Sequence, residues 1–230
     1  MSVASTTSQF RPRADAWQLP IRRGDPSCRE VALTFDDGPN DPNSLKIADA
    51  LDRAGVRGTF FAVAKAVAAR PDIVQALAAR GHLIGSHAYR HRRSAALVPG
   101  YPDLARAQRT LREALGAAPA WFRPPYGFWT PFVLHAASRE GLRVVNWDVI
   151  AHDWEIRDAE AIAKQVLGRV RGGSIVVLHD GRDGDLVGDR SATAAAVPRI
   201  LAGLAALGLA PVRLDELLGG PAYLESAEVA

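Results

Sequence analysis

The sequence predicts an α/β fold in which a parallel sheet closes, or nearly closes, into a barrel. Short apolar runs alternate with amphipathic stretches from Glu30 onward, and this alternation is typical of repeated strand–helix units. Reactive polar residues recur where several of the apolar runs end, and barrel enzymes gather their chemistry at the carboxyl ends of their strands. The alternation by itself would also allow an open, doubly wound sheet.

Seven apolar runs are the candidate strands of this sheet, at residues 30–35, 58–63, 82–87, 120–123, 143–149, 174–179 and 209–214. Amphipathic stretches between them are the candidate helices, at residues 44–54, 71–80, 102–115, 130–140, 158–170 and 191–207. Glycines that suit helix C-terminal caps follow these stretches closely, at Gly55, Gly81, Gly116, Gly141, Gly172 and Gly208. The side chains of Asp103, Thr130 and Ser191 suit helix starts.

Length and composition are compatible with one folded domain. The chain has 230 residues, of which 48% are hydrophobic and 23% charged, so a sizeable core is available. Residues 1–29 are polar, with scattered proline and arginine, and are predicted to form an extended arm. We expect the folded domain over residues 30–220, followed by a tail at 221–230.

Charge and cysteine content exclude several classes of function. The net charge is +3, and arginine is spread along the chain, so we expect no nucleic-acid partner. Cys28 is the single cysteine, which excludes an intrachain disulfide and cysteine-rich metal sites. No stretch reaches the ~18 apolar residues of a membrane span. The N-terminus lacks the apolar region of a signal peptide, which favours a cytoplasmic protein unless a signal was removed or the start is misplaced.

Two adjacent carboxylates close the first strand, in the segment VALTFDDGPN. Asp36 and Asp37 follow an apolar run, and Gly38-Pro39 turns the chain directly after them. Neighbouring side chains on a strand lie on opposite faces of the sheet, so these two adjacent residues can direct their carboxylates to different sides.

Two histidines close the third strand, in the segment GSHAYRHRRS. His87 and His91 are four residues apart and can face one ion if the backbone turns helically there, although the spacing also occurs in ordinary histidine pairs. With one aspartate from Asp36-Asp37 they would make a site of two histidines and one carboxylate. Such a site leaves positions open for water and substrate, which suits catalytic Zn²⁺ or a similar divalent ion.

Three further segments end or follow strands. In WFRPPYGFWT, Arg123 offers a charged fork that can hold a carboxylate, although this segment taken alone favours an arginine paired with a structural acid. His179 ends the apolar strand SIVVLHDG, where a structural histidine is more common. An acid such as Asp153 in NWDVIAHDWE could instead keep it protonated as a general acid. We expect structural roles for Asp148, His152 and His82. The polar segment GRDGDLVGDRS at 181–191 could be a lid, but a plain solvated connection is favoured.

The order of these motifs resembles the polysaccharide deacetylase family, which is also called carbohydrate esterase family 4 or the NodB homology domain. The motifs are TFDDGP, HAYRH, RPPYG, the segment around Asp148, Asp153 and Trp154, and LHD. The resemblance covers residues 30–218. It implies a distorted (β/α)7 barrel of the polysaccharide deacetylase type. It also implies metal-dependent hydrolysis of N-acetyl groups on the amino sugars of an N-acetylated glycan, such as chitin or peptidoglycan.

The resemblance assigns the first group of site residues. Asp37 resembles the metal-binding aspartate, with His87 and His91 as its partner ligands. Asp36 resembles the catalytic base, and Arg123 the residue that holds and orients that base. Two nearby cations would then offset the repulsion between the adjacent carboxylates.

The resemblance also assigns the groups around the leaving amine and the acetyl group. His179 resembles the catalytic acid, and Asp153 the acid that pairs with it. Tyr126 lies where the family uses a backbone N–H to stabilise the oxyanion. Trp154 and Leu178 would line an apolar slot for the acetyl methyl group.

The cofactor implied is one divalent metal ion. Zn²⁺ is expected from two histidines and one carboxylate, although Co²⁺, Ni²⁺ or Mn²⁺ could bind. Ala88 departs from the family, which usually has Ser or Thr there, and so lacks a hydroxyl that supports the metal-loop turn. We expect a monomer, and the family is often exported, which leaves the localisation open.

Two other functions are compatible with parts of the pattern. The same scaffold could hydrolyse another non-peptide C–N bond, such as that of a cyclic imide or ureide. Aromatic residues near the motifs could instead serve a carbohydrate-binding protein without activity: Tyr89, Tyr126, Phe128, Trp129 and Trp147. Such a binder would need neither a base such as Asp36 nor an acid such as His179.

Overall fold

The computed structural model describes residues 18–225, and a curled parallel sheet lies at its centre. Its strands are β1 (Glu30–Asp36), β2 (Thr59–Ala62), β3 (Leu83–Ser86), β4 (Trp121–Phe122), β5 (Arg143–Val144), β6 (Val149–Ile150), β7 (Ile175–His179) and β8 (Ala210–Val212). Seven of them follow the order β5-β4-β3-β2-β1-β7-β6, and β8 pairs with β1. All of these pairings are parallel, as predicted.

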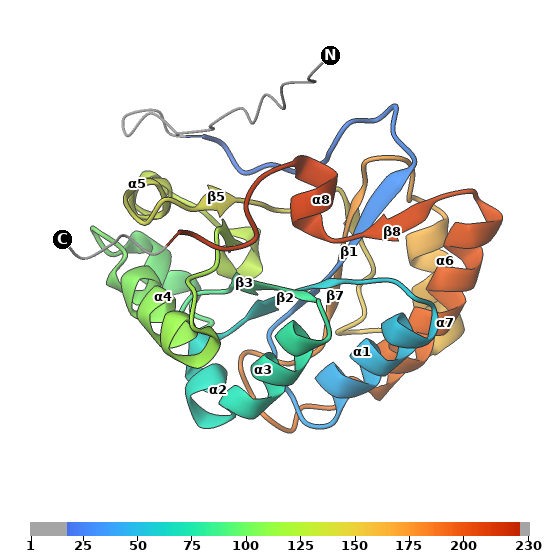
Figure 1. Ribbon diagram of the computed structural model, residues 1–230, viewed down its shortest axis with the longest axis horizontal. Helices are drawn as coiled ribbons and strands as arrows, with labels where there is room; N and C mark the ends of the chain where they lie inside the picture. Colours follow the sequence, from blue (N-terminus) through green and yellow to red (C-terminus); the bar gives the residue numbers. More distant parts are fainter. Residues whose placement is uncertain (1–17, 226–230) are drawn as a thin grey trace, which may run out of the picture.

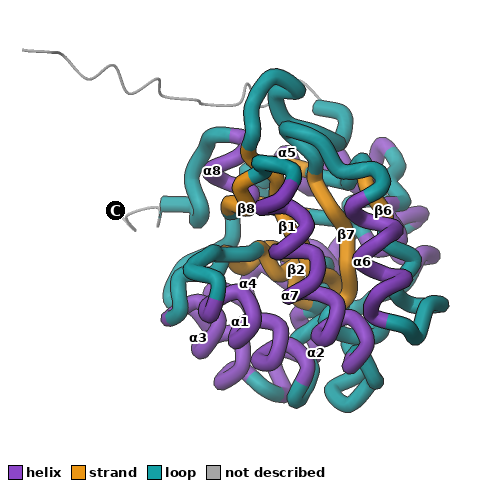
Figure 2. The backbone as a smooth tube through the Cα atoms, turned by 90° about the vertical axis from the view of Figure 1, so that its right-hand side faces the viewer, coloured by secondary structure: helices purple, strands orange, loops and turns teal. Residues whose placement is uncertain are grey.

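Helices cover the outside of this sheet. They are α1 (Asn43–Arg53), α2 (Ala64–Ala69), α3 (Pro71–Ala79), α4 (Pro102–Leu115), α5 (Pro131–Arg139), α6 (Ala159–Leu167), α7 (Ser191–Ala206) and α8 (Leu214–Leu218). The six expected helices are present, whereas the short α2 and α8 were not predicted. Helices α6 and α7 lie side by side on one flank, and α2, α3 and α4 lie on another (Figure 1). The view from the side shows β1, β2 and β7 enclosed by helices (Figure 2).

Strand β1 pairs with three other strands of the sheet. Its residues from Val31 to Phe35 are completely buried, because β7 pairs with one edge and β2 and β8 share the other. A parallel strand with both faces covered needs a nearly continuous apolar run, and the sequence supplies one. Phe35 stacks on Phe60 of β2 with ring centroids 5.0 Å apart. The strand therefore holds the residues at its carboxyl end in fixed positions.

The predicted strand at 143–149 is two strands at opposite ends of the sheet. Residues 143–144 pair with β4, whereas 149–150 pair with β7. Five residues can span only about 17 Å, so the two ends of the sheet must lie near each other. The sheet therefore curls into the distorted barrel that was expected, and the open, doubly wound alternative is excluded. The single strand was a wrong prediction because an apolar run does not show where its pairing partner changes.

The N-terminal segment crosses the seam of the barrel. Ile21 forms a bridge with Val145, and Arg23 forms one with Ser174 next to β7. The described part of the predicted arm thus packs on the barrel, while residues 1–17 of that arm and 226–230 of the tail lie outside the described residues. The domain limits of 30 and 220 stay a prediction. Between residues 18 and 225, no helix is long and apolar enough to cross a bilayer.

Candidate active site

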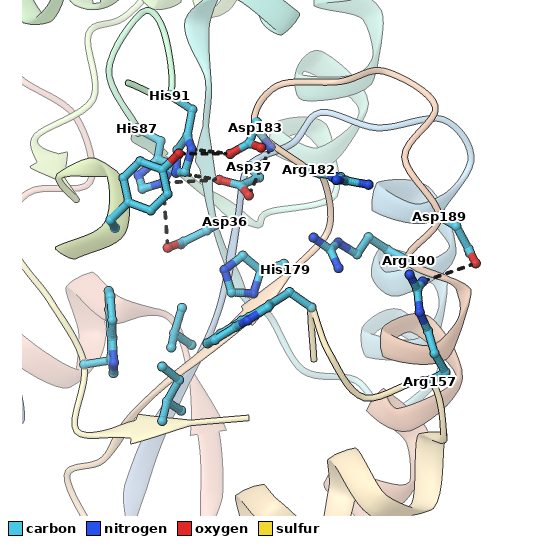
Figure 3. A pocket seen from close by; sticks show the side chains of 15 residues that line it. Asp36, Asp37, His87, His91, Arg157, His179, Arg182, Asp183, Asp189 and Arg190 are labelled. Atoms are coloured by element: carbon cyan, nitrogen blue, oxygen red, sulfur yellow. Dashed lines mark hydrogen bonds and ion pairs between the residues drawn. The ribbon is translucent and has the colours of Figure 1, made fainter. Parts of the chain in front are cut away.

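The carboxyl ends of the strands bring the motif residues together. Asp36 at the end of β1 is the register partner of His179 at the end of β7. Ser86 of β3 pairs with Phe122 of β4, so the residues that follow them, His87 and Arg123, also leave the sheet together. Because every pairing is parallel, these four residues meet at one end of the barrel. Figure 3 shows three of them, Asp36, His87 and His179, around one cavity.

Asp37, His87 and His91 form a candidate metal site. The Oδ1 atom of Asp37 lies 3.4 Å from Nε2 of His87 and 3.1 Å from Nε2 of His91. One ligand atom from each residue lies within 4.8 Å of the others. Asp37 Oδ1 is buried and accepts no hydrogen bond. A buried carboxylate oxygen without a partner is costly, and a cation bound between the three side chains would provide that partner.

The surroundings prepare these residues for a cation. His87 Nδ1 lies 2.7 Å from the carbonyl oxygen of Arg123, which can only accept, so Nδ1 carries the proton and Nε2 is free to bind metal. Burial would raise the pKa of Asp37, but the neighbouring imidazoles of His87, His179 and His91 hold that pKa well below its ordinary value. Two imidazoles and one carboxylate fit a catalytic divalent metal ion.

Asp36 faces a different partner. Its Oδ1 accepts a hydrogen bond of 2.8 Å from Arg123 Nη1, which also donates to Thr34 Oγ1 at 2.7 Å. Arg123 Nη2 donates to the carbonyl oxygen of Asn146, and its guanidinium lies 4.3 Å above the Phe61 ring. The guanidinium is completely buried, so its position is fixed by these contacts. The structure thus brings Asp36 and Arg123 together, as expected, and adds Thr34 and Asn146 as partners.

His179 is held by a buried carboxylate. Asp153 accepts from His179 Nδ1 at 2.8 Å and from its backbone N–H at 2.8 Å, and it also accepts from Thr193 Oγ1 at 2.8 Å. Burial would lower the pKa of His179, but Asp153 raises it to about 9. The imidazole therefore keeps its proton at neutral pH. Thr193 lies 40 residues from Asp153 on α7, and no sequence pattern signals this contact.

A buried aspartate below the site ties its loops together. Asp180 accepts from the backbone N–H of Gly38 at 3.0 Å and from the Ser44 hydroxyl. Burial raises the pKa of Asp180 to about 7. The next residue, Gly181, packs so closely that a Cβ would lie 2.4 Å from the carbonyl oxygen of Asp37. The segment after β7 is therefore fixed at its base against the segment after β1.

The site opens into a cavity of about 620 Å³. It is lined by Asp36, Asp37, His87, His91, Tyr126, Trp147, Ile150, Trp154, Arg157, Val177, His179, Arg182, Asp183, Asp189 and Arg190. The predicted apolar residue Trp154 is among them. The structure does not bring Leu178 into the cavity, because strand alternation turns it into the core while Val177 faces the same side as His179.

The loop at 181–191 is part of the site, which corrects the favoured interpretation as a plain connection. Four of its residues line the cavity, namely Arg182, Asp183, Asp189 and Arg190. Periodicity gave no signal for this, because a polar loop has no apolar face to reveal its direction.

Two residues expected to be structural have structural contacts. Asp148 accepts from the backbone N–H of Ile175 at 2.8 Å and from the Ser174 hydroxyl at 3.0 Å. His82 is buried and accepts from the backbone N–H of Gly58 at 3.2 Å. Burial lowers the pKa of His82 to about 4, so it is neutral at physiological pH.

A curled parallel barrel with a candidate metal site, a carboxylate and a protonated histidine in one cavity defines the class of metal-assisted hydrolases. The model of the polysaccharide deacetylase family matches residues 23–145. The chain belongs to this family, which confirms the resemblance predicted from the sequence.

Relatives of this chain carry related names. A chitooligosaccharide deacetylase of Bradyrhizobium sp. (strain ANU 289) is 37% identical over 66% of this chain and 71% of its own. A peptidoglycan-N-acetylglucosamine deacetylase of Listeria monocytogenes is 33% identical over 83% of this chain but only 39% of its own. The crystal structure of the Bc1960 peptidoglycan N-acetylglucosamine deacetylase superposes with a TM-score of 0.82 and 30% identity, covering 89% of this chain and 94% of that one.

Proposed function

We propose that this protein is a metal-dependent N-deacetylase that hydrolyses the acetamido group of N-acetylated amino sugars in a glycan. The observation that carries the proposal is the placement of a base-type carboxylate and an acid-type histidine around one candidate metal site in one cavity. The names of relatives from Bradyrhizobium and Listeria agree with this reaction.

The metal would be held by Asp37, His87 and His91, with Zn²⁺ the expected ion. When bound there, such an ion polarises a carbonyl oxygen and lowers the pKa of water. The Arg123 guanidinium offsets the charge of Asp36 and fixes its direction, so that Asp36 can take a proton from the attacking water.

His179 serves the departing nitrogen. An amide nitrogen is a poor leaving group unless it is protonated as the C–N bond breaks, and the His179 imidazolium holds that proton. Water adds to the acetyl carbon, Asp36 takes one proton, and His179 gives another to the amine. The products are acetate and the free amino sugar.

The remaining parts of the cavity suit the acetyl group. The backbone N–H of Tyr126 is proposed to stabilise the oxyanion, as the family resemblance implies. Trp154, Val177 and Ile150 give one part of the cavity an apolar lining for the methyl group.

The proposal is tested by acetate release after metal stripping and reconstitution. The apo protein and protein reloaded with Zn²⁺, Co²⁺, Ni²⁺ or Mn²⁺ would be assayed on N-acetylglucosamine oligomers, on peptidoglycan and on allantoin. We expect acetate from a glycan only after reloading. Hydrolysis of allantoin instead, or glycan binding without acetate release under every metal, would overturn the proposal.

A further inference from the structure

Three arginines form one wall of the active-site cavity. Arg157 lies in the segment after Trp154, and Arg182 and Arg190 lie in the loop after β7. Figure 3 shows Arg182 and Arg190 on the opposite side of the site from His87 and His91. We call Arg157, Arg182 and Arg190 the arginine wall.

The arginine wall carries more positive charge than its neighbours neutralise. Arg157 lies 3.7 Å from Asp189, and both side chains are largely exposed. Arg190 is only 7% exposed, and its Nε donates to the carbonyl oxygen of Gly181 at 2.6 Å. Among residues 18–225, neither Arg182 nor Arg190 forms a direct ion pair, and Arg190 and Arg157 share the nearby charge of Asp189, whose pKa both of them lower. A guanidinium that is buried without a carboxylate partner is costly unless an anion from outside joins it.

The proposed reaction fixes which part of a substrate would face this wall. The acetyl oxygen belongs beside the candidate metal ligands Asp37, His87 and His91, and the amine nitrogen beside His179. His179 lies between the histidine pair and the two arginines Arg182 and Arg190 (Figure 3), so a sugar attached to that nitrogen would have the arginine wall within its reach.

We propose that the arginine wall binds an oxyanion substituent of the glycan, such as a carboxylate, on or next to the sugar that loses its acetyl group. Guanidinium groups bind carboxylates, and also sulfates, through paired N–H donors. This proposal rests on the proposed deacetylase function and specifies its substrate as an acidic glycan.

The test compares three glycans of equal length. One is a neutral N-acetylglucosamine oligomer, the second carries a free lactyl carboxylate on alternate sugars, and the third carries a sulfate. We expect kcat/KM for acetate release to be about ten-fold higher or more with an anionic glycan, and this advantage to shrink in high salt.

Variants of the wall make the test specific. Arg182→Gln and Arg190→Gln should each lower the ratio of kcat/KM between the anionic and the neutral glycan about ten-fold. Arg182 is exposed and makes no side-chain hydrogen bond that the structure records, so we expect Arg182→Gln to fold. This variant keeps the test available even if Arg190→Gln, which loses the contact with Gly181, does not fold. Arg109→Gln on α4, outside the cavity, removes the same charge and should leave the ratio unchanged.

The outcomes separate the two proposals. Equal kcat/KM for neutral and anionic glycans, with ratios unchanged in both variants, would overturn the acidic substrate and leave the deacetylase function intact. Preference for the sulfated over the carboxylated glycan would support an oxyanion site while identifying sulfate as its ligand. Absence of acetate from every glycan would overturn the deacetylase function and this inference with it.

A second observation concerns the support of His91. Asp183 Oδ1 lies 2.5 Å from His91 Nδ1, the ring nitrogen that points away from the candidate metal position. The backbone N–H of Asp183 donates to Asp37 Oδ2 at 3.2 Å. Asp183 itself adopts a left-handed backbone conformation with φ of 51°. One loop residue thus contacts two of the three candidate metal ligands.

Ala88 lies between the two candidate histidine ligands and has no hydroxyl group. Its side chain is completely buried in an apolar cluster with Tyr101 and Phe122, so the metal loop is not supported by a hydroxyl at this position. We infer that Asp183 is a positioning residue that fixes the ring of His91 for metal binding from a distant part of the chain. A carboxylate this close to Nδ1 also favours the ring form in which Nε2 is the metal ligand.

Zinc affinity tests this inference without an activity assay. Competition with a chelator should give a Zn²⁺ dissociation constant about ten-fold to a hundred-fold weaker for Asp183→Ala, and less weakened for Asp183→Asn, which keeps an acceptor oxygen. Asp185→Asn in the same loop is the matched control. An unchanged dissociation constant in Asp183→Ala, or equal weakening in Asp185→Asn, would overturn the positioning role.

Discussion

Two carboxylate–cation pairs lie in the active site and differ in one respect. Asp36 contacts Arg123 at 2.8 Å, and Asp153 contacts His179 at 2.8 Å. Both carboxylates are 3% exposed. The difference is the cation, because an arginine side chain stays protonated in proteins whereas a histidine side chain can transfer its proton.

The comparison gives a physical reason for the opposite roles proposed for the two pairs. Beside a permanent cation, a carboxylate that faces the cavity is the group able to take up a proton. Beside a carboxylate, a histidine that faces the cavity holds a proton that it can give away. The partner behind each residue therefore decides whether that residue accepts or donates.

The largest effect is expected when the base of the first pair is removed. Asp36→Asn should lower acetate release by about 10²–10⁴-fold, the usual contribution of general base catalysis. The metal content, measured by elemental analysis, should stay at the wild-type level, because Asp37, His87 and His91 are unchanged.

Asp37→Asn is the matched control for Asp36→Asn and should lose metal. Circular dichroism would check that both variants fold, since Asp36 is the carboxylate partner of the buried Arg123. Loss of metal in Asp36→Asn would contradict the division of labour between the two aspartates.

A smaller effect is expected from neutralising the carboxylate of the second pair. Asp153 raises the pKa of His179 to about 9, so the imidazolium is present below that pH and is lost as the pH rises through it. In Asp153→Asn the effect of burial, which lowers the pKa of His179, is opposed only by the charges of Asp37 and Asp36. The alkaline limb of the kcat profile should therefore move to lower pH, and kcat at pH 8 should fall about ten-fold or more.

Nuclear magnetic resonance titration of His179 in metal-free protein would measure this pKa directly, because a bound cation would lower it. An alkaline limb at the same pH in Asp153→Asn as in the wild type would show that His179 is not the proton donor.

The smallest effect is expected from Thr193, which contacts Asp153 but not His179. Thr193→Val keeps the shape of the side chain but removes the hydroxyl that donates to Asp153. We expect a loss of about 1 kcal/mol in the free energy of unfolding, measured by urea denaturation, and an alkaline limb that changes less than in Asp153→Asn. Thr110→Val removes a hydroxyl from α4 and should leave the limb in place.

The sequence predicted the parts of the site that strand ends determine. Parallel strands place their carboxyl ends together, so Asp36, Asp37, His87, Arg123 and His179 could be expected to meet once the strands were recognised. Their catalytic and metal-binding roles stay predictions that the experiments above test. The fold was confirmed for the same reason, since alternation of strands and helices specifies a parallel sheet.

The parts that were missed depend on contacts between distant segments. Thr193 reaches Asp153, and Asp183 reaches His91, and neither contact leaves a periodic trace in the sequence. The division of the strand at 143–149 depends on which neighbours pair with each half. Leu178 was predicted to line the cavity, but its neighbour Val177 does so. The resemblance between motifs did not show which of these two adjacent strand residues faces the cavity.

The close packing of Gly181 against Asp37 has a consequence for how this site can evolve. The base of the loop at 181–191 accepts no larger residue, because any Cβ at Gly181 would collide with the backbone of Asp37 and Gly38. Beyond that point Arg182, Asp185 and Val187 are exposed. Selection can therefore replace the outer residues of the loop one by one and give related enzymes new substrates, while the anchored glycine keeps the reactive groups in register.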